Sequence, residues 1–464
     1  MSNRIEEVKY DVVVAGAGSA GVAAALAAGK NGAKTILIDS SPYLGGDLVS
    51  GLPIDGCLNA RGEWIIGGVA RELFALSKSM GGFVEPVFDW RLMYGVCVDP
   101  DMLKLAIVRA VAESKIKTLL YSFVDGVVMK GNRLEGVTVV NKKGRTLVKG
   151  DYYIDCTGDG DVAVMAGSEY EAGGPNKEFQ PVSLVYWMGN VDYQKYLEFI
   201  RDNPEEFILA ESPVIHKDKA GCALELYKSG HPFAMLSGKG SILGKAVQTG
   251  EMFPTWSMST WPTAPGRKEL GFNTTRVADI DATDPDVMSE ALATLVKQVE
   301  TAVKFAKTRL PGFEKAELAG VAPRIGIRET RRIMGEYVLT KEDVLEGKKS
   351  ELGIAKGAHH VDVHGSGTAQ HRQPVKDGMS YDIPYGCILP KKLENLLIAG
   401  RCLSSTREAH GSARVMAQCM ATGEAAATAA AMCIKKGLKN SRDLDVAELR
   451  GQLKAQGAVV DGTH

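Results

Sequence analysis

Apolar residues near the start of the chain form two short runs separated by an alanine-rich segment. The first run, Tyr10 to Ala15, is rich in β-branched residues and has the length of a strand. The second run, Lys34 to Ile38, is similar and ends at Asp39. Asn31-Gly32 terminates the alanine-rich segment between them, as expected for a helix. The pattern predicts a β-α-β unit over residues 9–40.

Glycines mark the turn from the first strand into this helix. The order Gly16-Ala17-Gly18-Ser19-Ala20-Gly21 has the spacing G-x-G-x-x-G. The first glycine permits the tight turn, the second lets a pyrophosphate approach the backbone, and the third lets helix and sheet pack closely. An acid at the end of the second strand is placed to bind a ribose. We therefore predict a dinucleotide site, and the alternative is a glycine-rich turn of another β-α-β fold. Its expected residues are Gly16, Gly18, Ser19, Ala20, Gly21, Asp39 and Ser40.

The rest of the pattern mixes helices with short strands. Start and stop signals predict helices over residues 68–80, 100–114, 285–310 and 411–436. The apolar stripe expected for the third of these is Met288, Leu292, Leu295, Val299 and Ala306. Residues 117–153 are typical of a β-meander with turns at 130–132, 142–144 and 149–151, followed by strands at 152–156 and 395–399.

A change of composition near Gly173-Gly174-Pro175 suggests how the chain is divided. The region after it contains Trp187, Trp256 and Trp261. We predict an α/β fold in which a nucleotide-binding domain with a parallel sheet is interrupted by an inserted α+β substrate domain. The expected parts are residues 1–174 and 376–437 for the first domain, 175–375 for the insertion and 438–464 for a loosely attached tail.

The composition limits the expected cellular location of the protein and its expected binding partners. The 464 residues carry 55 Lys and Arg against 56 Asp and Glu, so the net charge of −1 gives no basic field for nucleic acid or anionic lipid. The charged N-terminus does not match a signal peptide, and no apolar run reaches the length of a membrane span. The eight cysteines contain no C-x-x-C and read as reduced thiols. We expect a cytoplasmic protein without nucleic-acid or membrane partners.

Five motifs carry a resemblance to a known family. They are GAGSAG at 16–21, DCTGDGD at 155–161, RIGIRETRRIMGEYVLT at 324–340, YDIPYGCILPKKLENLLIAGRCLSS at 381–405 and GSARVMAQCMATG at 411–423. Over nearly its whole length the chain resembles FAD-dependent oxidoreductases, broadly related to the succinate dehydrogenase and fumarate reductase flavoproteins. The resemblance implies FAD as the cofactor and a glutathione-reductase-type FAD-binding domain interrupted by a substrate domain.

The same resemblance implies further cofactor contacts. A glycine pair after the second strand resembles one that lines the diphosphate and ribityl side, and a mid-chain turn resembles the motif near the adenine half. A late glycine and the helix after it resemble the final FAD motif, whose helix N-terminus faces the flavin. Many relatives carry aspartate where this chain has arginine after that late glycine. The residues concerned are Gly45, Gly46, Thr157, Gly158, Asp159, Gly400, Arg401, Gly411 and Ser412.

Four arginines in the motif regions are candidates for anion binding, namely Arg328, Arg331, Arg332 and Arg414. A guanidinium can clamp a carboxylate or phosphate through two hydrogen bonds. One or two of them are expected to bind an anionic or polar substrate or to stabilise reduced flavin. The alternative is that they are solvated or form interdomain ion pairs with Glu329, Glu336 or Glu408. We favour Arg328 and Arg414 as the functional pair.

Histidines are concentrated between residues 359 and 410. His410 stands just before the helix expected to face the flavin, so we predict that it exchanges the proton during hydride transfer, with a structural cap as the alternative. His364 and Tyr381 are further candidates for acid–base chemistry or substrate orientation. His360, Asp362 and His364 would share one face of a strand, but no further ligand spacing supports a metal and none is predicted.

The predicted function is hydride transfer between a small polar organic substrate and flavin N5. An FAD-containing electron-transfer subunit and a flavin monooxygenase or halogenase are the alternatives. The sequence lacks cluster-binding cysteine spacings, the late G-D motif and the W-x-W-x-I-P motif that would favour them. No second G-x-G-x-x-G in strand–helix context marks a nicotinamide domain, so the electron donor or acceptor is unassigned. A homo-oligomer is left open.

Overall fold

A sheet that is parallel at its centre forms the core of the fold. The computed structural model describes residues 6–365 and 370–462. The strand order of this seven-stranded sheet is β6-β2-β1-β9-β8-β7, and β21 also pairs with β9. Pairs among β6, β2, β1, β9 and β21 are parallel, whereas β7 and β8 add antiparallel pairs. The strands are β1 (Glu6–Ala15), β2 (Thr35–Ile38), β6 (Lys117–Leu119), β7 (Phe123–Lys130), β8 (Arg133–Asn141), β9 (Gly144–Asp155) and β21 (Leu396–Ile398).

The expected β-α-β start is confirmed, because α1 (Ser19–Lys30) connects the parallel strands β1 and β2. The expected meander is partly wrong. Residues 144–155 form one long strand, and no turn interrupts it at Lys149-Gly150-Asp151. Gly150 pairs with Tyr10 of β1, and its amide donates to the Tyr153 hydroxyl at 2.7 Å. Pairing with β1 therefore keeps extended a segment whose composition favours a turn.

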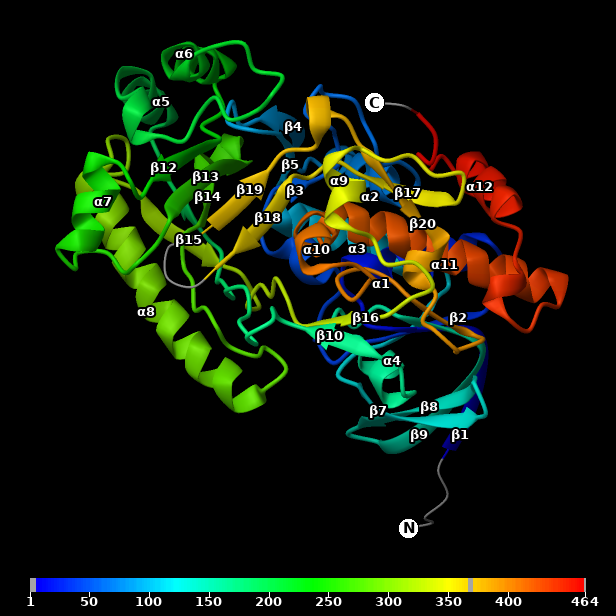
Figure 1. The fold of residues 1–464 in the computed structure, drawn as a ribbon. Coiled ribbons are helices and arrows are strands. Elements are labelled where there is room, and N and C mark those ends of the chain that lie inside the picture. Colours follow the sequence, from blue (N-terminus) through cyan, green and yellow to red (C-terminus); the bar gives the residue numbers. More distant parts are fainter. Residues whose placement is uncertain (1–5, 366–369, 463–464) are drawn as a thin grey trace.

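A second, fully antiparallel sheet has the order β12-β13-β14-β11-β15. Figure 1 shows it on the other side of the molecule from the parallel sheet, with α5 to α8 around it and the β18–β19 hairpin between the two sheets. The elements here are β11 (Tyr186–Gly189), α5 (Tyr193–Asp202), α6 (Lys219–Ser229), β12 (Ala234–Ser237), α7 (Ser241–Gln248), β13 (Ser257–Ala264), β14 (Glu269–Asn273), α8 (Pro285–Arg309) and β15 (Glu317–Val321).

Smaller elements complete the fold. Three two-stranded sheets pair β10 (Tyr170–Ala172) with β16 (Arg331–Ile333), β17 (Gly353–Gly357) with β20 (Tyr381–Pro384), and β18 (Val361–His364) with β19 (Gln370–Gln373). A three-stranded sheet contains β3 (Ile54–Asp55), β5 (Tyr94–Val98) and β4 (Val84–Phe88). The remaining short helices are α2 (Gly68–Ser79), α3 (Pro100–Glu113), α4 (Asp161–Met165) and α9 (Lys341–Leu345).

The long helix α8 confirms its predicted bounds but not all of its predicted stripe. Asp284 caps it by accepting from the amides of Asp286 and Val287. Leu292, expected on the apolar face, is 46% exposed, whereas Ala291 and Phe305 are buried. The predicted Leu295, Val299 and Ala306 are buried, so the packed face agrees with the expected one except at Leu292.

The expected helix from Gly411 to Lys436 is two helices. Helix α10 (Arg407–Ala413) ends at Arg414, and α11 (Met416–Lys436) begins after Val415, whose backbone is extended. The second helix packs directly on α1, since a Cβ built at Gly423 would lie 2.1 Å from the Ala20 carbonyl oxygen. The two ends of the chain's nucleotide-binding region are thereby joined.

The segment after residue 437 is not loosely attached, contrary to the expectation. It contains α12 (Val446–Ala455), whose Leu449 and Leu453 are fully buried. The buried ammonium of Lys356 donates to the Gly462 carbonyl at 2.9 Å and to Asp382 at 2.6 Å. The tail is therefore packed against the body of the protein.

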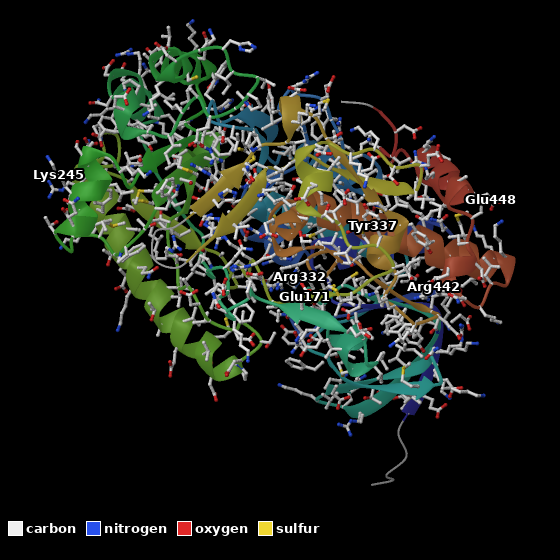
Figure 2. All side chains as sticks on the ribbon, viewed as in Figure 1. Glu171, Lys245, Arg332, Tyr337, Arg442 and Glu448 are labelled. Carbon is white, nitrogen blue, oxygen red and sulfur yellow. The ribbon has the colours of Figure 1, made fainter. Side chains whose placement is uncertain are left out.

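Buried ion pairs connect the motif at 324–340 to its surroundings. Glu329 is fully buried and accepts from Arg332 Nη1 at 2.9 Å and from Arg407 Nε at 3.1 Å. Arg332 also contacts Glu171 at 3.2 Å (Figure 2). Arg331 pairs with Asp161 at 2.9 Å. Arg332 thus forms the expected ion pair with Glu329, whereas Arg331 pairs with an aspartate of the mid-chain motif and not with one of the expected glutamates.

The described residues contain no helix with both the length and the apolar character needed to cross a membrane. Their buried hydrophobic side chains form three clusters, one around the parallel sheet, one around the antiparallel sheet and a smaller one around β20. All eight cysteines are buried and free of disulfides.

Candidate active site

The three glycines of the first turn have different surroundings. A Cβ at Gly16 would lie 2.3 Å from the Cys156 carbonyl oxygen, and one at Gly21 would lie 1.7 Å from that of Gly16. A Cβ at Gly18 would meet nothing within 4 Å, and Gly18 begins α1 without a side-chain cap. Gly16 and Gly21 are therefore required by packing, while open space lies above Gly18 at a helix N-terminus. A helix N-terminus with open space above it fits a bound diphosphate.

The neighbouring loops close around this turn. The Asp39 carboxylate accepts from the Ala17 amide and, at 2.6 Å, from the Ser41 amide, so it fixes the backbone beside Gly18. Gly46 has a φ of +53°, and a Cβ there would lie 2.9 Å from the Gly18 Cα. The structure thus brings Gly45 and Gly46 to the first turn, as expected. Asp39 and Ser40 lie outside the cavity lining described below, and the ribose contact of Asp39 stays a prediction.

The mid-chain motif forms a second wall of the same groove. Asp155 is fully buried and accepts from the Thr157 amide and hydroxyl and from the Ala163 amide, which holds the turn in place. Burial raises the pKa of Asp155 to about 6. Asp159 pairs with Arg401 Nη2 at 2.8 Å. Arg401 therefore supports the turn through Asp159.

The helix that presents its N-terminus to the groove is α11 and not α10. Val415, Met416 and Cys419 line the cavity together with Gly400 and Arg401. The expected contacts of Gly411 and Ser412 with the cofactor are wrong in position. A Cβ at Gly411 would lie 2.6 Å from the Asp362 carbonyl oxygen, and the Ser412 hydroxyl bonds to Tyr381 at 2.7 Å. Gly411 thus packs α10 onto β18 and Ser412 joins α10 to β20, because the helix break moves the free N-terminus five residues along the chain.

One cavity joins this groove to the antiparallel sheet. It encloses about 280 Å³. Its cofactor side includes Gly18, Ser19, Ala20, Thr157 and Gly158, and its far side includes Phe233, Met235, Trp256 and Trp261 of the sheet region. Between them lie the polar residues Asp55, Arg276, Arg328, Asp362, His364, Gln370 and Arg414. Residues far apart in the sequence thus line a single cavity.

A histidine–aspartate pair is part of the lining of this cavity. His364 Nε2 and Asp362 Oδ2 are 2.8 Å apart. Burial lowers the pKa of His364 to about 4, whereas the neighbouring His364, His360 and Arg414 outweigh burial and hold that of Asp362 well below its ordinary value. An ionised carboxylate only accepts, so neutral His364 donates from Nε2 and keeps a lone pair on Nδ1. That nitrogen forms no hydrogen bond within the described chain, so it is able to accept a proton.

The structure brings Arg328 and Arg414 into this cavity, as favoured from the sequence. Arg328 Nη1 donates to the Pro181 carbonyl and the Ser183 hydroxyl, both at 2.6 Å. Burial and the charge of Arg414 lower the pKa of Arg328 to about 9. Arg414 Nη2 lies 3.8 Å from Asp362 Oδ2. Both guanidinium groups therefore remain charged at neutral pH beside the histidine–aspartate pair.

His410 and Tyr381 are not where the sequence suggested. His410 is fully buried inside α10, its Nε2 bonds to the Arg401 carbonyl oxygen at 2.8 Å, and burial lowers its pKa well below the ordinary value. Tyr381 is fully buried on β20 and bonds to Ser412. Neither is among the described residues that line the cavity. The prediction for His410 is wrong in its geometry because His410 lies inside α10, whereas the helix whose N-terminus faces the groove is α11.

Sequence reasoning missed several polar residues of the cavity. Arg276 comes from the loop after β14, Asp55 from β3, and Gln180 contacts His364 and Arg414 from a third segment. Burial and the charge of Asp89 raise the pKa of Asp55 to about 8. Arg324 lies 3.5 Å from Asp47 beside Gly46. It is the first residue of the motif at 324–340, so of the missed residues it alone stood in a segment that the sequence marked as functional. In the described part of the chain, no three His, Cys, Asp or Glu residues form a group suited to a metal ion.

Comparison with known proteins identifies the class. The family model described as FAD dependent oxidoreductase matches residues 11–453. The chain belongs to this family of FAD-dependent oxidoreductases. It is accordingly an oxidoreductase, and its cofactor is FAD. The expected resemblance is confirmed.

Other proteins are more distantly similar to this chain. The tRNA uridine 5-carboxymethylaminomethyl modification enzyme MnmG of Geobacter sulfurreducens is 28% identical over 156 residues, 31% of this chain and 24% of that protein. The chain thus matches about a quarter of the length of that curated relative. A geranylgeranyl bacteriochlorophyll reductase-like protein of Thermoplasma acidophilum is 12% identical with a TM-score of 0.46, covering 97% of this chain and 84% of that one.

The flavin-dependent brominase Bmp2 is 11% identical with a TM-score of 0.47, covering 97% and 83% of the two chains. The p-nitrophenol 4-monooxygenase of Pseudomonas putida is 11% identical with a TM-score of 0.46, covering 93% of this chain and 82% of that one. At these identities and TM-scores the solved structures carry no argument about substrate or reaction.

Proposed function

We propose that this enzyme transfers a hydride between a small polar organic substrate and N5 of its flavin. The observation that carries the proposal is the continuous cavity, which leads from the dinucleotide turn at Gly18 to the His364–Asp362 pair. Hydride transfer needs residues that hold the substrate and a group that exchanges a proton. The cavity contains arginines that can hold a substrate and a histidine that can exchange a proton.

Different residues of the chain bind the cofactor, exchange the proton and orient the substrate. The bound flavin supplies the two-electron redox chemistry. Gly18, Gly46 and the N-termini of α1 and α11 offer backbone to the cofactor, and Arg324 adds positive charge beside them. His364 takes a proton at Nδ1 because Asp362 fixes its tautomer through Nε2. Arg328 and Arg414 orient a polar or anionic substrate.

The finer description of the fold belongs to the same proposal. We interpret the parallel-sheet region as a glutathione-reductase-type FAD-binding domain and the antiparallel-sheet region as a substrate domain inserted into it. The buried reduced cysteines agree with a cytoplasmic location, and the net charge of −1 argues against an RNA substrate. The partners that we propose are a small-molecule substrate and a separate electron donor or acceptor.

Anaerobic flavin bleaching tests the reaction. The holoenzyme is mixed with polyols, hydroxy acids and enoates, the last after prior reduction of the flavin, and the flavin absorbance is followed. We expect one class to change the absorbance, and His364→Ala to keep FAD but slow the change by about 100-fold or more, the scale for loss of a general base. His371→Ala is the matched control, because His371 is an exposed histidine on the paired strand β19.

Three outcomes would contradict the proposal. Wild-type rates in His364→Ala would remove the proton-transfer role from this pair. Oxygen consumption with a nicotinamide reductant and no anaerobic turnover would favour the monooxygenase alternative. Reduction by a partner protein alone would favour the electron-transfer subunit.

A further inference from the structure

Two arginines of the cavity have only neutral partners. Arg276 Nη2 donates to the Gly365 carbonyl at 2.7 Å, and Arg328 donates to the Pro181 carbonyl and the Ser183 hydroxyl. Neither forms an ion pair with a carboxylate of the described residues, although the charge of Asp279 acts on Arg276 from a greater distance. Buried Arg332, by contrast, has two carboxylate partners. The cavity thus contains guanidinium groups that the protein itself does not neutralise.

The remaining charges of the cavity do not restore the balance. Asp362 is the carboxylate nearest to Arg414, at 3.8 Å, but its Oδ2 bonds to His364 and its Oδ1 accepts from Gln370 at 2.6 Å. Besides burial, the charges of Arg414 and Arg276 lower the pKa of Arg328, while those of Asp362 and Asp47 raise it, and the net shift is downward, so the carboxylates do not fully offset the positive charge around Arg328. Clustered buried charges of one sign are unfavourable unless an opposite charge joins them. An anion from outside the chain would supply it.

Unused hydrogen-bond donors lie at the same place. Arg414 Nε and Gln180 Nε2 are buried without a partner in the described chain. The two side chains contact each other through Arg414 Nη2 and Gln180 Oε1 at 3.5 Å. Buried donors are normally satisfied, so Arg414 Nε, which belongs to a residue of the cavity lining, is a donor that an acceptor oxygen of a ligand would satisfy, whereas Gln180 lies next to Arg414 but outside the lining. Positive charge and free donors thus coincide.

We propose that the substrate carries a carboxylate, which binds between Arg276 and Arg328 with Arg414 beside them. The inference rests on the proposed function and names its substrate class. Two oxygens of a carboxylate match the forked donors of guanidinium groups. Phe233, Met235, Trp256 and Trp261 on the far side of the cavity provide an apolar wall for the rest of the molecule. The substrate class is therefore a small organic acid with an apolar body, rather than a neutral polyol.

Titration of the holoenzyme with a simple acid tests the site without knowledge of the substrate. Benzoate is the probe, benzamide its neutral analogue and inorganic phosphate a competing anion, with flavin absorbance and thermal stability as readouts. We expect benzoate to shift both saturably and benzamide to bind at least about tenfold more weakly, since hydrogen bonds to charged groups contribute about 1.5–3 kcal/mol.

Variants assign the effect to the arginines. Arg276→Gln and Arg328→Gln are each expected to raise the Kd for benzoate by about tenfold or more while FAD stays bound. Arg276→Lys keeps the charge and is expected to fall between the wild type and Arg276→Gln. Arg309→Gln is the matched control, because it removes the same charge from the end of α8, where Arg309 pairs with Glu251 at 2.8 Å and is half-exposed.

Several results would overturn the inference. They are benzamide binding as tightly as benzoate, tighter binding of phosphate than of benzoate, or wild-type affinity in Arg276→Gln. Loss of FAD from Arg276→Gln or Arg276→Lys would assign the charge to the cofactor instead. An enzyme that turns over a neutral substrate and ignores benzoate refutes only this inference. One that binds benzoate but never exchanges hydride refutes only the proposed function.

Discussion

Two glycines three residues apart are predicted to fail in opposite ways when a methyl group is added. Gly18 has a φ of −74°, which any residue adopts, and a Cβ there would meet nothing within 4 Å. We expect Gly18→Ala to change the stability of the FAD-free protein by less than about 1 kcal/mol, because the entropic gain and the poorer N-cap offset each other. In the holoenzyme the methyl intrudes on the diphosphate groove. A cost of about 1–3 kcal/mol, the range for overpacking, raises the Kd for FAD by about 5- to 150-fold.

Gly21→Ala places its methyl against backbone instead. The Cβ would lie 1.7 Å from the Gly16 carbonyl oxygen and 3.3 Å from the Cys156 Cβ, so α1 has to move away from β1. We expect a loss of more than about 3 kcal/mol even without FAD.

The assay uses flavin-stripped protein, with thermal unfolding followed by circular dichroism and FAD binding by flavin fluorescence. Wild-type FAD affinity in Gly18→Ala would show that the groove does not run over Gly18. Equal destabilisation by the two variants would refute the packing argument.

Two further predictions concern stability. The pKa of Asp55 is raised, first by burial. Between about pH 3.8 and about pH 8 the folded protein therefore keeps a proton on Asp55, whereas the unfolded chain has lost it. The free energy of unfolding consequently falls as the pH rises through this range. Asp55→Asn is expected to flatten this slope, by at most about 1.4 kcal/mol per pH unit, in thermal unfolding of the holoenzyme at pH 5 and pH 8; equal slopes would contradict the argument. Glu329→Gln leaves buried Arg332 and Arg407 without their shared carboxylate and should cost about 3–5 kcal/mol in denaturant unfolding, whereas Glu336→Gln, whose partner Arg442 is half-buried at the surface, should cost less than about 1 kcal/mol. Similar losses in the two glutamate variants would refute the difference.

Features set by short-range chemistry were predictable from the sequence. The β-α-β start follows from glycine spacing and two apolar runs, and α8 follows from the Asp284 cap and the Pro311-Gly312 stop. The preference for Arg328 and Arg414 over Arg331 and Arg332 agrees with their placement. In each case the signal lies within a few residues of the feature.

Features set by distant contacts were not predictable. Nothing in Ala413-Arg414-Val415 signals a helix break, yet Gly411 packs on the backbone of β18 and Gln418 bonds to Gly56 and Lys356 carbonyls on either side of it. The break moved His410 away from the groove. The contact of Arg276 with Gly365 spans 89 residues, and that of Gln180 with His364 spans 184. Such pairings are decided by packing and leave no local pattern.

The contact of α11 with α1 has a consequence for how the protein is made. Strand β21 and helix α11, which complete the sheet and the cofactor groove, come from residues after 395, whereas α1 ends at Lys30. During translation, β1, α1 and β9 therefore leave the ribosome long before β21 and α11. Until these last elements are made, the apolar surfaces of the earlier ones stay exposed and the FAD groove is incomplete. Because α11 completes the groove, a product truncated before residue 395 is expected to be colourless, since it cannot retain FAD.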